Sequence, residues 1–148
     1  MALDMIRDSE EVRAPRDVWR AMLRGFGLRC PKCGEGRLFR SFLKVADRCP
    51  ACGEELHHQR ADDAPAYFTI VVVGHIIVGG VLGLERAYAP ATWVHAVIWL
   101  PLTLIASLVL LPRVKGTLVG LQWALRMHGF GGEVDHVDPP PAPRPTAE

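Results

Sequence analysis

Two long apolar runs within residues 66–111 dominate the hydrophobic pattern of this chain. The runs cover residues 66–84 and 93–111, and neither contains a Lys, Arg, Asp or Glu. At about 1.5 Å per residue, a helix of about 20 residues crosses the hydrocarbon core of a bilayer, which is about 30 Å thick. The pattern therefore predicts two transmembrane helices, joined by residues 85–92 into a helical hairpin.

Residues 1–28 hold a shorter amphipathic segment. Over residues 16–26, apolar side chains recur on one face, and three arginines follow one another at every fourth position on another. This spacing predicts a helix that lies in the lipid headgroup region or packs on the domain that follows it. Gly25 and Gly27 are expected to end this helix because glycine has the lowest helix propensity after proline.

A second amphipathic helix is expected after the hairpin, over residues 113–129, with Lys115 on its polar face. Pro112 is expected to end the second span or bend it sharply, and Pro101 to kink it. Residues 133–148 are rich in proline and lack apolar periodicity, which predicts a disordered tail.

Four cysteines precede the hairpin in two C-x2-C pairs, Cys30 with Cys33 and Cys49 with Cys52, separated by fifteen residues. Two such knuckles suit the tetrahedral coordination of Zn²⁺. We expect one structural Zn²⁺ in a zinc ribbon over residues 29–58, a fold with a minimal core that depends on its metal. An iron site, an iron–sulfur cluster and a redox-active cysteine pair remain as alternatives.

The residues around the knuckles refine this prediction. Gly34 and Gly53 directly follow the second cysteine of each pair, where a turn with positive φ directs backbone N–H groups at the sulfurs. Short strands are expected near residues 38–39 and 42–45. His57 and His58 are expected on the surface, because four thiolates already complete the metal shell.

The distribution of charge predicts how the chain sits in a membrane. The 17 Lys and Arg nearly balance the 16 Asp and Glu, so the net charge of +1 says little about partners. Lys and Arg crowd the segment before the first span and reappear after the second, whereas the connecting segment has only Arg86. The positive-inside rule then places both termini in the cytoplasm. That compartment is reducing, which disfavours disulfides and favours metal ligation by the cysteines.

The start of the first span carries a capping pattern. Pro65 suits the first turn of a helix, and Asp63 is a candidate N-cap. The alternative is that Asp62 and Asp63 form a functional acidic pair at the membrane face.

Few polar or small residues interrupt the two spans. His75 is near the expected midplane and needs a partner, so we expect a neutral imidazole bonded to Thr103 or to a backbone carbonyl. Haem or copper ligation by His75 and His95 is the alternative, but the two lie at different depths. Gly79 and Gly83 form a small-xxx-small pair, a spacing that permits close helix approach. We expect both glycines to meet bulky residues of the second span that lie at the same depth.

The combination of these motifs resembles a known family. Both knuckles, the Asp-Asp-Ala-Pro-Ala juncture at residues 62–66 and the Pro-Arg-Val-Lys-Gly stretch at residues 112–116 are similar to the bacterial domain-of-unknown-function 983 family. The resemblance covers residues 28–126 and implies a small inner-membrane protein with a zinc-ribbon-like start and two spans. Ala64 departs from the glycine that is usual in the family. The family has no established activity, and a role in assembling respiratory complexes is implied only by gene neighbourhood.

The residues point to a non-enzymatic function. No Ser–His–Asp arrangement and no Gly-rich phosphate loop after a strand is present. We expect a bacterial inner-membrane protein that contacts the lipid bilayer and binds another membrane protein or complex as an accessory or assembly factor. Metal handling or thiol-redox chemistry by the knuckles is one alternative. Nucleic-acid binding by the ribbon is another, disfavoured because acidic residues dilute its basic ones. A homo-oligomer is left open.

Overall fold

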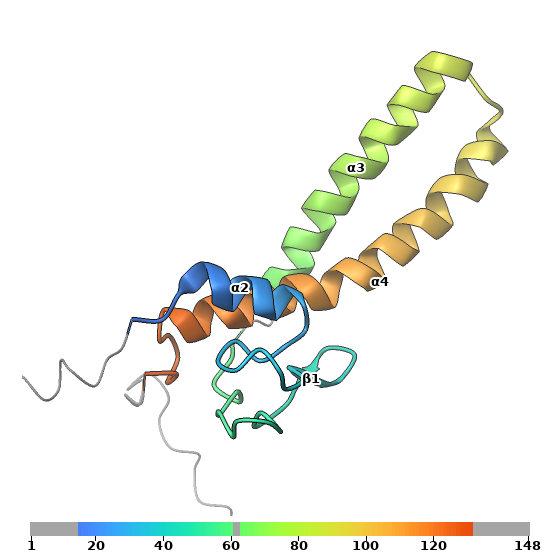
Figure 1. The fold of residues 1–148 in the computed structure, drawn as a ribbon. Coiled ribbons are helices and arrows are strands. Elements are labelled where there is room, and N and C mark those ends of the chain that lie inside the picture. Colours follow the sequence, from blue (N-terminus) through green and yellow to red (C-terminus); the bar gives the residue numbers. More distant parts are fainter. Residues whose placement is uncertain (1–14, 61–62, 132–148) are drawn as a thin grey trace, which may run out of the picture.

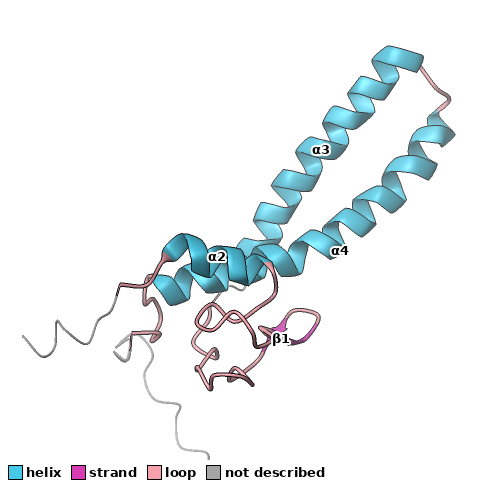
Figure 2. Ribbon diagram, viewed as in Figure 1, coloured by secondary structure: helices cyan, strands magenta, loops and turns pink. Residues whose placement is uncertain are grey.

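The structure is a computed structural model that describes residues 15–60 and 63–131. The predictions for residues 1–14, for Asp62 and for the tail over residues 133–148 lie outside the described residues. The elements are α2 (Val18–Phe26), β1 (Phe39–Ser41), β2 (Lys44–Val45), α3 (Ala64–Tyr88) and α4 (Thr92–Ala124). A mostly helical chain with two long apolar helices and a two-stranded antiparallel sheet confirms the predicted fold class (Figures 1 and 2).

Helices α3 and α4 form the hairpin and extend away from the rest of the molecule (Figure 1). The most apolar windows of the two helices have mean hydropathies of 2.1 and 2.3, yet only 11% and 0% of these windows are buried inside the chain. The core helix of a soluble protein would be mostly buried, so this apolar surface needs lipid or a partner around it. Both helices are long and apolar enough to cross a membrane, which suggests a membrane protein.

Contacts at the far end of the hairpin hold its helices together. The ring of Trp99 lies against Gly80, where a side chain would overlap it. One turn further out, His95 Nε2 lies 3.0 Å from Glu85 Oε2, and Trp99 Nε1 donates to His95 Nδ1 at 3.2 Å. Ala89 then reverses the chain in the left-handed region, at φ 42°. His95 thus bridges Trp99 and Glu85 by hydrogen bonds within the hairpin.

The polar and small residues predicted to lie between the spans are mostly turned away from α4. His75 is exposed, and its Nδ1 lies 2.7 Å from the Val71 carbonyl, one turn earlier on the same helix. The expectation of a backbone carbonyl was correct, whereas Thr103 is not the partner because its hydroxyl donates to the Trp99 carbonyl at 2.6 Å. Each side chain is satisfied by its own helix, so neither requires close contact between helices.

Gly79 and Gly83 do not meet the bulky residues of the second span. No atom lies within 4 Å of where a Cβ would stand on either residue, so that expectation was wrong. Gly80, between them, makes the close contact with α4 instead. The reason is rotation: neighbouring helix positions differ by about 100°, and the face with Gly80 is the one turned inward.

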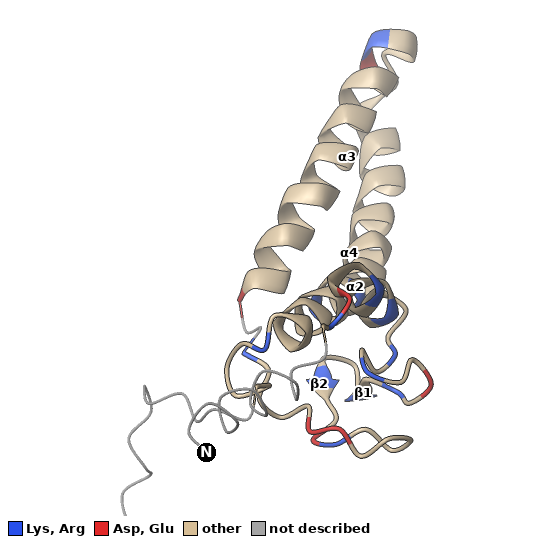
Figure 3. Cartoon of the chain, turned by 60° about the vertical axis from the view of Figure 1, so that its left-hand side comes forward, with Lys and Arg blue, Asp and Glu red and all other residues tan. Residues whose placement is uncertain are grey.

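The second span does not end at Pro112. Helix α4 continues for 33 residues through both Pro101 and Pro112, so the helix predicted over residues 113–129 is its C-terminal part and stops at Ala124. A proline removes only one N–H, and Pro112 is buried where α4 packs against the rest of the molecule. The helix changes direction along its length instead of breaking (Figures 1 and 3).

Helix α2 packs against this C-terminal part of α4 through small residues. Ala21 and Gly25 on α2 are buried, and they face Gly120 and Gly116 on α4. A Cβ on Gly25 would overlap the Gly116 carbonyl, so the two backbones are in direct contact. Gly25 is therefore an interior helix residue and does not end α2, contrary to the prediction. The helix ends at Phe26, with Gly27 as its C-cap.

The described core lies where the ribbon meets these two helices. Buried ribbon residues cluster with buried residues of α2, α4 and the turn that follows α4; they include Leu38, Leu56, Ala21, Val119, Trp123 and Phe130. In Figure 1, α2 and the end of α4 form a layer, with the hairpin on one side and the ribbon on the other. The small ribbon thus gains a core by sharing one with the helices.

Candidate metal centre

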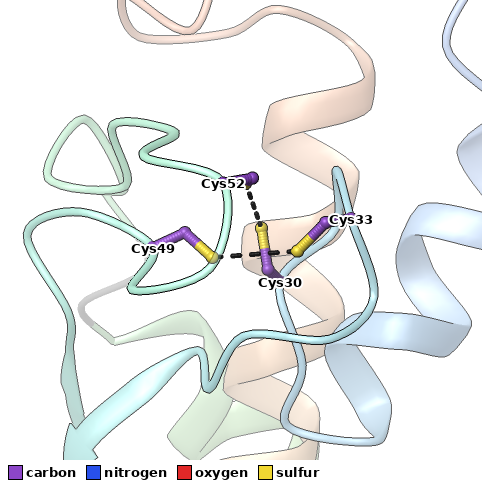
Figure 4. Close-up of side chains that lie close together, drawn as sticks. All are labelled: Cys30, Cys33, Cys49 and Cys52. Atoms are coloured by element: carbon purple, nitrogen blue, oxygen red, sulfur yellow. Dashed lines mark hydrogen bonds between the residues drawn. The ribbon is translucent and has the colours of Figure 1, made fainter.

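The two knuckles bring the four cysteine sulfurs together, as Figure 4 shows. Each knuckle turns at a glycine in the left-handed region, Gly34 at φ 77° and Gly53 at φ 72°, as the sequence predicts. The turns are closed by hydrogen bonds from Gly34 N–H to the Cys30 carbonyl and from Gly53 N–H to the Cys49 carbonyl. Strands β1 and β2 connect the knuckles and lie within one or two residues of the expected strands.

The spacing of the sulfurs fits a four-coordinate metal. All four Sγ atoms lie within 4.8 Å of one another, and the Cys30–Cys52 and Cys33–Cys49 pairs are both 3.8 Å apart. With metal–sulfur bonds of about 2.3 Å, a tetrahedron has sulfur–sulfur edges of about 3.8 Å. A disulfide needs about 2.05 Å, and all four cysteines are free thiols. The predicted ligands are therefore placed as a metal site requires.

The environment of the thiols differs from one knuckle position to the next. A hydrogen bond from the backbone N–H of Gly36 lowers the pKa of the Cys33 thiol to about 6. Burial raises the pKa of the Cys30 thiol and, less strongly, that of the Cys52 thiol. Burial penalises thiolate charge, so a bound cation is what would allow all four sulfurs to ionise together.

A third glycine, Gly36, also shapes the site, and its role was not predicted from the sequence. A Cβ on Gly36 would overlap the Cys49 sulfur, and the Gly36 carbonyl accepts a hydrogen bond from Cys30 N–H at 2.8 Å. The Cys-Gly-Glu-Gly order of residues 33–36 was the visible feature, but only the fold shows that the second glycine faces the other knuckle.

Glu54 connects the metal centre to the membrane helices. Its carboxylate accepts from Trp123 Nε1 of α4 at 2.7 Å and pairs with Lys32 Nζ of the first knuckle at 2.7 Å. Burial opposes the ionisation of Glu54, but these two partners outweigh it, so the pKa of Glu54 lies below its usual value. From α2, Arg24 donates to the Pro31 and Lys32 carbonyls at 3.0 and 2.6 Å. Both knuckles are thus tied to the helices.

A family comparison agrees with this arrangement. The family model described as a protein of unknown function, DUF983, matches residues 39–123. The chain belongs to the DUF983 family. The DUF983 match runs from β1 through the second knuckle and the hairpin to the end of α4, so the first knuckle precedes it. No curated protein and no solved structure matches the chain.

The remaining predicted residues of this DUF983 chain lie apart from the metal centre. Asp63 occupies the N-cap of α3 but makes no side-chain cap bond, and its carbonyl accepts from Ala66 N–H instead. Pro65 is buried in the first turn, as expected. Lys115 is half-buried on α4 and makes no ion pair with any described residue.

A second group of side chains that could bind a metal lies at the C-terminal end of the ribbon. The ligand atoms of Glu55, His57 and His58 lie within 4.8 Å of one another. Glu55 already pairs with Arg48 at 2.7 Å and with His58 at 3.4 Å, and the His58 ring packs edge-on against Phe130. These contacts explain the group as a surface ion-pair cluster.

Proposed function

We propose that this protein is a non-enzymatic accessory or assembly factor for a membrane complex, with the bacterial inner membrane as its site. Its ribbon would dock on the cytoplasmic side, and its hairpin would bind another membrane protein, for which a respiratory complex is the favoured candidate. Both termini would face the cytoplasm, because the Lys and Arg side chains gather at the ribbon end of the molecule (Figure 3).

The observation that carries this proposal is the open face of α3. His75, Gly79 and Gly83 follow one another at four-residue spacing, so they share one side of the helix, and all three are exposed. Small residues let another helix approach closely in lipid, and an imidazole offers a hydrogen bond there. Lipid tails make no specific interaction with such a face, whereas a partner helix could pack closely on the glycines and bond to the imidazole.

We propose zinc as the metal of the ribbon. The 3.8 Å sulfur–sulfur distances match the edges of a zinc tetrathiolate, and closed four-cysteine shells are typical of structural zinc. In this role the ion stabilises the docking surface and takes no part in a reaction.

A test of the function compares partner recovery between two double variants. Gly79→Leu/Gly83→Leu fills the open face of α3, and Val97→Leu/Ile105→Leu changes exposed positions of α4 as a matched control. After cross-linking in membranes and affinity purification, we expect a defined membrane protein to be recovered with the wild type and the control, and to be lost with the glycine variant. Equal recovery of the same proteins from all three would contradict the docking face.

Metal handling or thiol chemistry is the second candidate function. The lowered pKa of Cys33 and the exposure of Cys52 favour it, because thiolates at accessible positions exchange metal and react with electrophiles. Rapid alkylation of the purified protein, with release of metal to a chelator, would support this function. Thiols that stay unreactive until the fold is disrupted would support the structural role.

Nucleic-acid binding by the ribbon gains little support. Several basic residues at its surface are paired with carboxylates, among them Arg40 with Asp47 at 3.3 Å and Arg48 with Glu55 at 2.7 Å. Such pairs leave less free positive charge for a phosphate backbone.

A further inference from the structure

A basic cleft lies between α2, the first knuckle and the end of α4. Its volume is about 420 Å³, and five cationic side chains line it: Arg16, Arg20, Arg24, Lys32 and Arg126. These residues come from three separate parts of the chain, so their convergence could not be predicted from the sequence. One carboxylate, that of Asp17, also lines the cleft.

Backbone carbonyls hold two of these arginines, Arg16 and Arg24, in place without cancelling their charge. Arg16 Nη1 donates to the Trp123 carbonyl at 2.6 Å and to the Phe130 carbonyl at 3.2 Å, and its guanidinium lies 4.3 Å from the centre of the Trp123 ring. Arg24 donates to the Pro31 and Lys32 carbonyls. A neutral acceptor fixes the position of a guanidinium but leaves its positive charge in the cleft.

Among the described residues, two carboxylates lie near the cleft and offset part of its positive charge. Asp17 accepts from the backbone N–H of Arg20 at 3.0 Å as the N-cap of α2, and Glu54 pairs with Lys32. Burial and the charge of Arg126 lower the pKa of Arg16, and the charge of Glu54 partly opposes them. The Arg20 side chain is exposed and has no hydrogen bond or ion pair with any described residue.

The position of the cleft indicates what kind of anion it would bind. Helix α2 lies at the base of the hairpin (Figure 1). Its exposed apolar side chains form a stripe beside its basic face. In that stripe Trp19 is 69% exposed, Leu23 54% and Phe26 46%. Aromatic and apolar side chains next to guanidinium groups are typical of helices at the headgroup level of a bilayer.

We propose that this cleft binds the phosphate headgroup of an anionic phospholipid at the membrane surface. Guanidinium groups recognise phosphate oxygens by paired, charge-assisted hydrogen bonds, and those that are held in place lose little conformational freedom on binding. The exposed stripe of α2 would contact the acyl chains of the same leaflet. The lipid would thereby fix α2, and with it the ribbon, against the membrane.

The test measures lipid retention by the full-length protein in detergent, using native mass spectrometry. The probes are phosphatidylglycerol and phosphatidylcholine with identical acyl chains. We expect about tenfold preferential retention of phosphatidylglycerol, because charge-assisted hydrogen bonds discriminate at this level. Arg20→Gln should lose most of this preference, whereas Arg20→Lys should keep most of it.

Arg40→Gln is the matched control, because it removes one positive charge from β1, outside the cleft, and should leave the preference unchanged. In the last comparison, inorganic phosphate alone is added in place of a lipid, and the stabilisation that it gives is measured. Three results would each overturn the proposal: no preference in the wild type, equal preference in Arg20→Gln and the wild type, or stabilisation by inorganic phosphate equal to that by phosphatidylglycerol. Melting temperatures in phosphatidylcholine should be the same for Arg20→Gln and the wild type, since the Arg20 side chain makes no contact that supports the fold.

Discussion

Single glycines decide how closely the helices of this protein approach. Gly116 of α4 meets the backbone of α2 at Gly25, and a Cβ on Gly116 would overlap the Gly25 carbonyl. We therefore expect Gly116→Ala to force the helices apart and lower stability by about 1–3 kcal/mol, the usual cost of overpacking. Thermal unfolding in detergent measures this effect. Gly79→Ala is the control, since it points into open space, and equal melting temperatures for the two variants would show that the α2–α4 contact is unimportant.

Trp123 provides a second prediction at the residue scale. Its indole N–H donates to Glu54 and helps to satisfy a partly buried carboxylate. Trp123→Phe keeps most of the apolar contact but leaves that carboxylate without one donor, so we expect a loss of about 1–3 kcal/mol. Trp19→Phe on the exposed face of α2 is the matched control. The prediction fails if both variants unfold at the wild-type temperature.

What the sequence reveals about a residue depends on whether its role is local. The positive φ angles of Gly34 and Gly53 were predictable, because the turn after a Cys-x-x-Cys pair requires them within a few residues. The roles of Gly36 and Gly116 depend on contacts with chain segments far away in the sequence. The open Gly79 and Gly83 look the same in the sequence as the closely packed Gly116 and Gly120.

Helix caps give a prediction at the scale of elements. Asp17 accepts from Arg20 N–H at the start of α2, whereas Asp63 at the start of α3 makes no side-chain cap bond. We expect Asp17→Ala to destabilise the packing of α2 by about 0.5–2 kcal/mol, and Asp63→Ala to have a much smaller effect. Hydrogen exchange of the α2 amides reports on this directly. Similar protection of α2 in both variants would contradict the assignment.

The elements themselves were largely predictable, but their ends were less so. Both spans were visible as uncharged apolar runs, because hydrocarbon excludes charge over a fixed length. The sequence did not show that α4 passes through Pro112, since the outcome depends on burial of the ring in the folded molecule. Helix α4 is therefore both a membrane span and the support for the ribbon.

The whole molecule joins a candidate metal centre to a membrane hairpin through one shared core. The sequence predicted both parts in the correct order, and the four cysteines converge as expected. It did not predict that Leu38 and Leu56 of the ribbon share a core with Val119 and Trp123 of α4. This shared core explains how so small a ribbon is held, and it implies that metal loss would also loosen α2 and the end of α4.

Metal analysis of the detergent-purified protein, combined with thermal unfolding, tests whether a bound metal ion stabilises the ribbon and the core that it shares with the helices. The comparison is between the wild type and the Cys49→Ser/Cys52→Ser variant, which removes one knuckle from the site. We predict about one zinc per chain in the wild type, and in the variant the loss of both the zinc and a large part of the thermal stability. Iron or copper in place of zinc, or a variant that loses its metal without losing stability, would contradict the structural role of the metal centre.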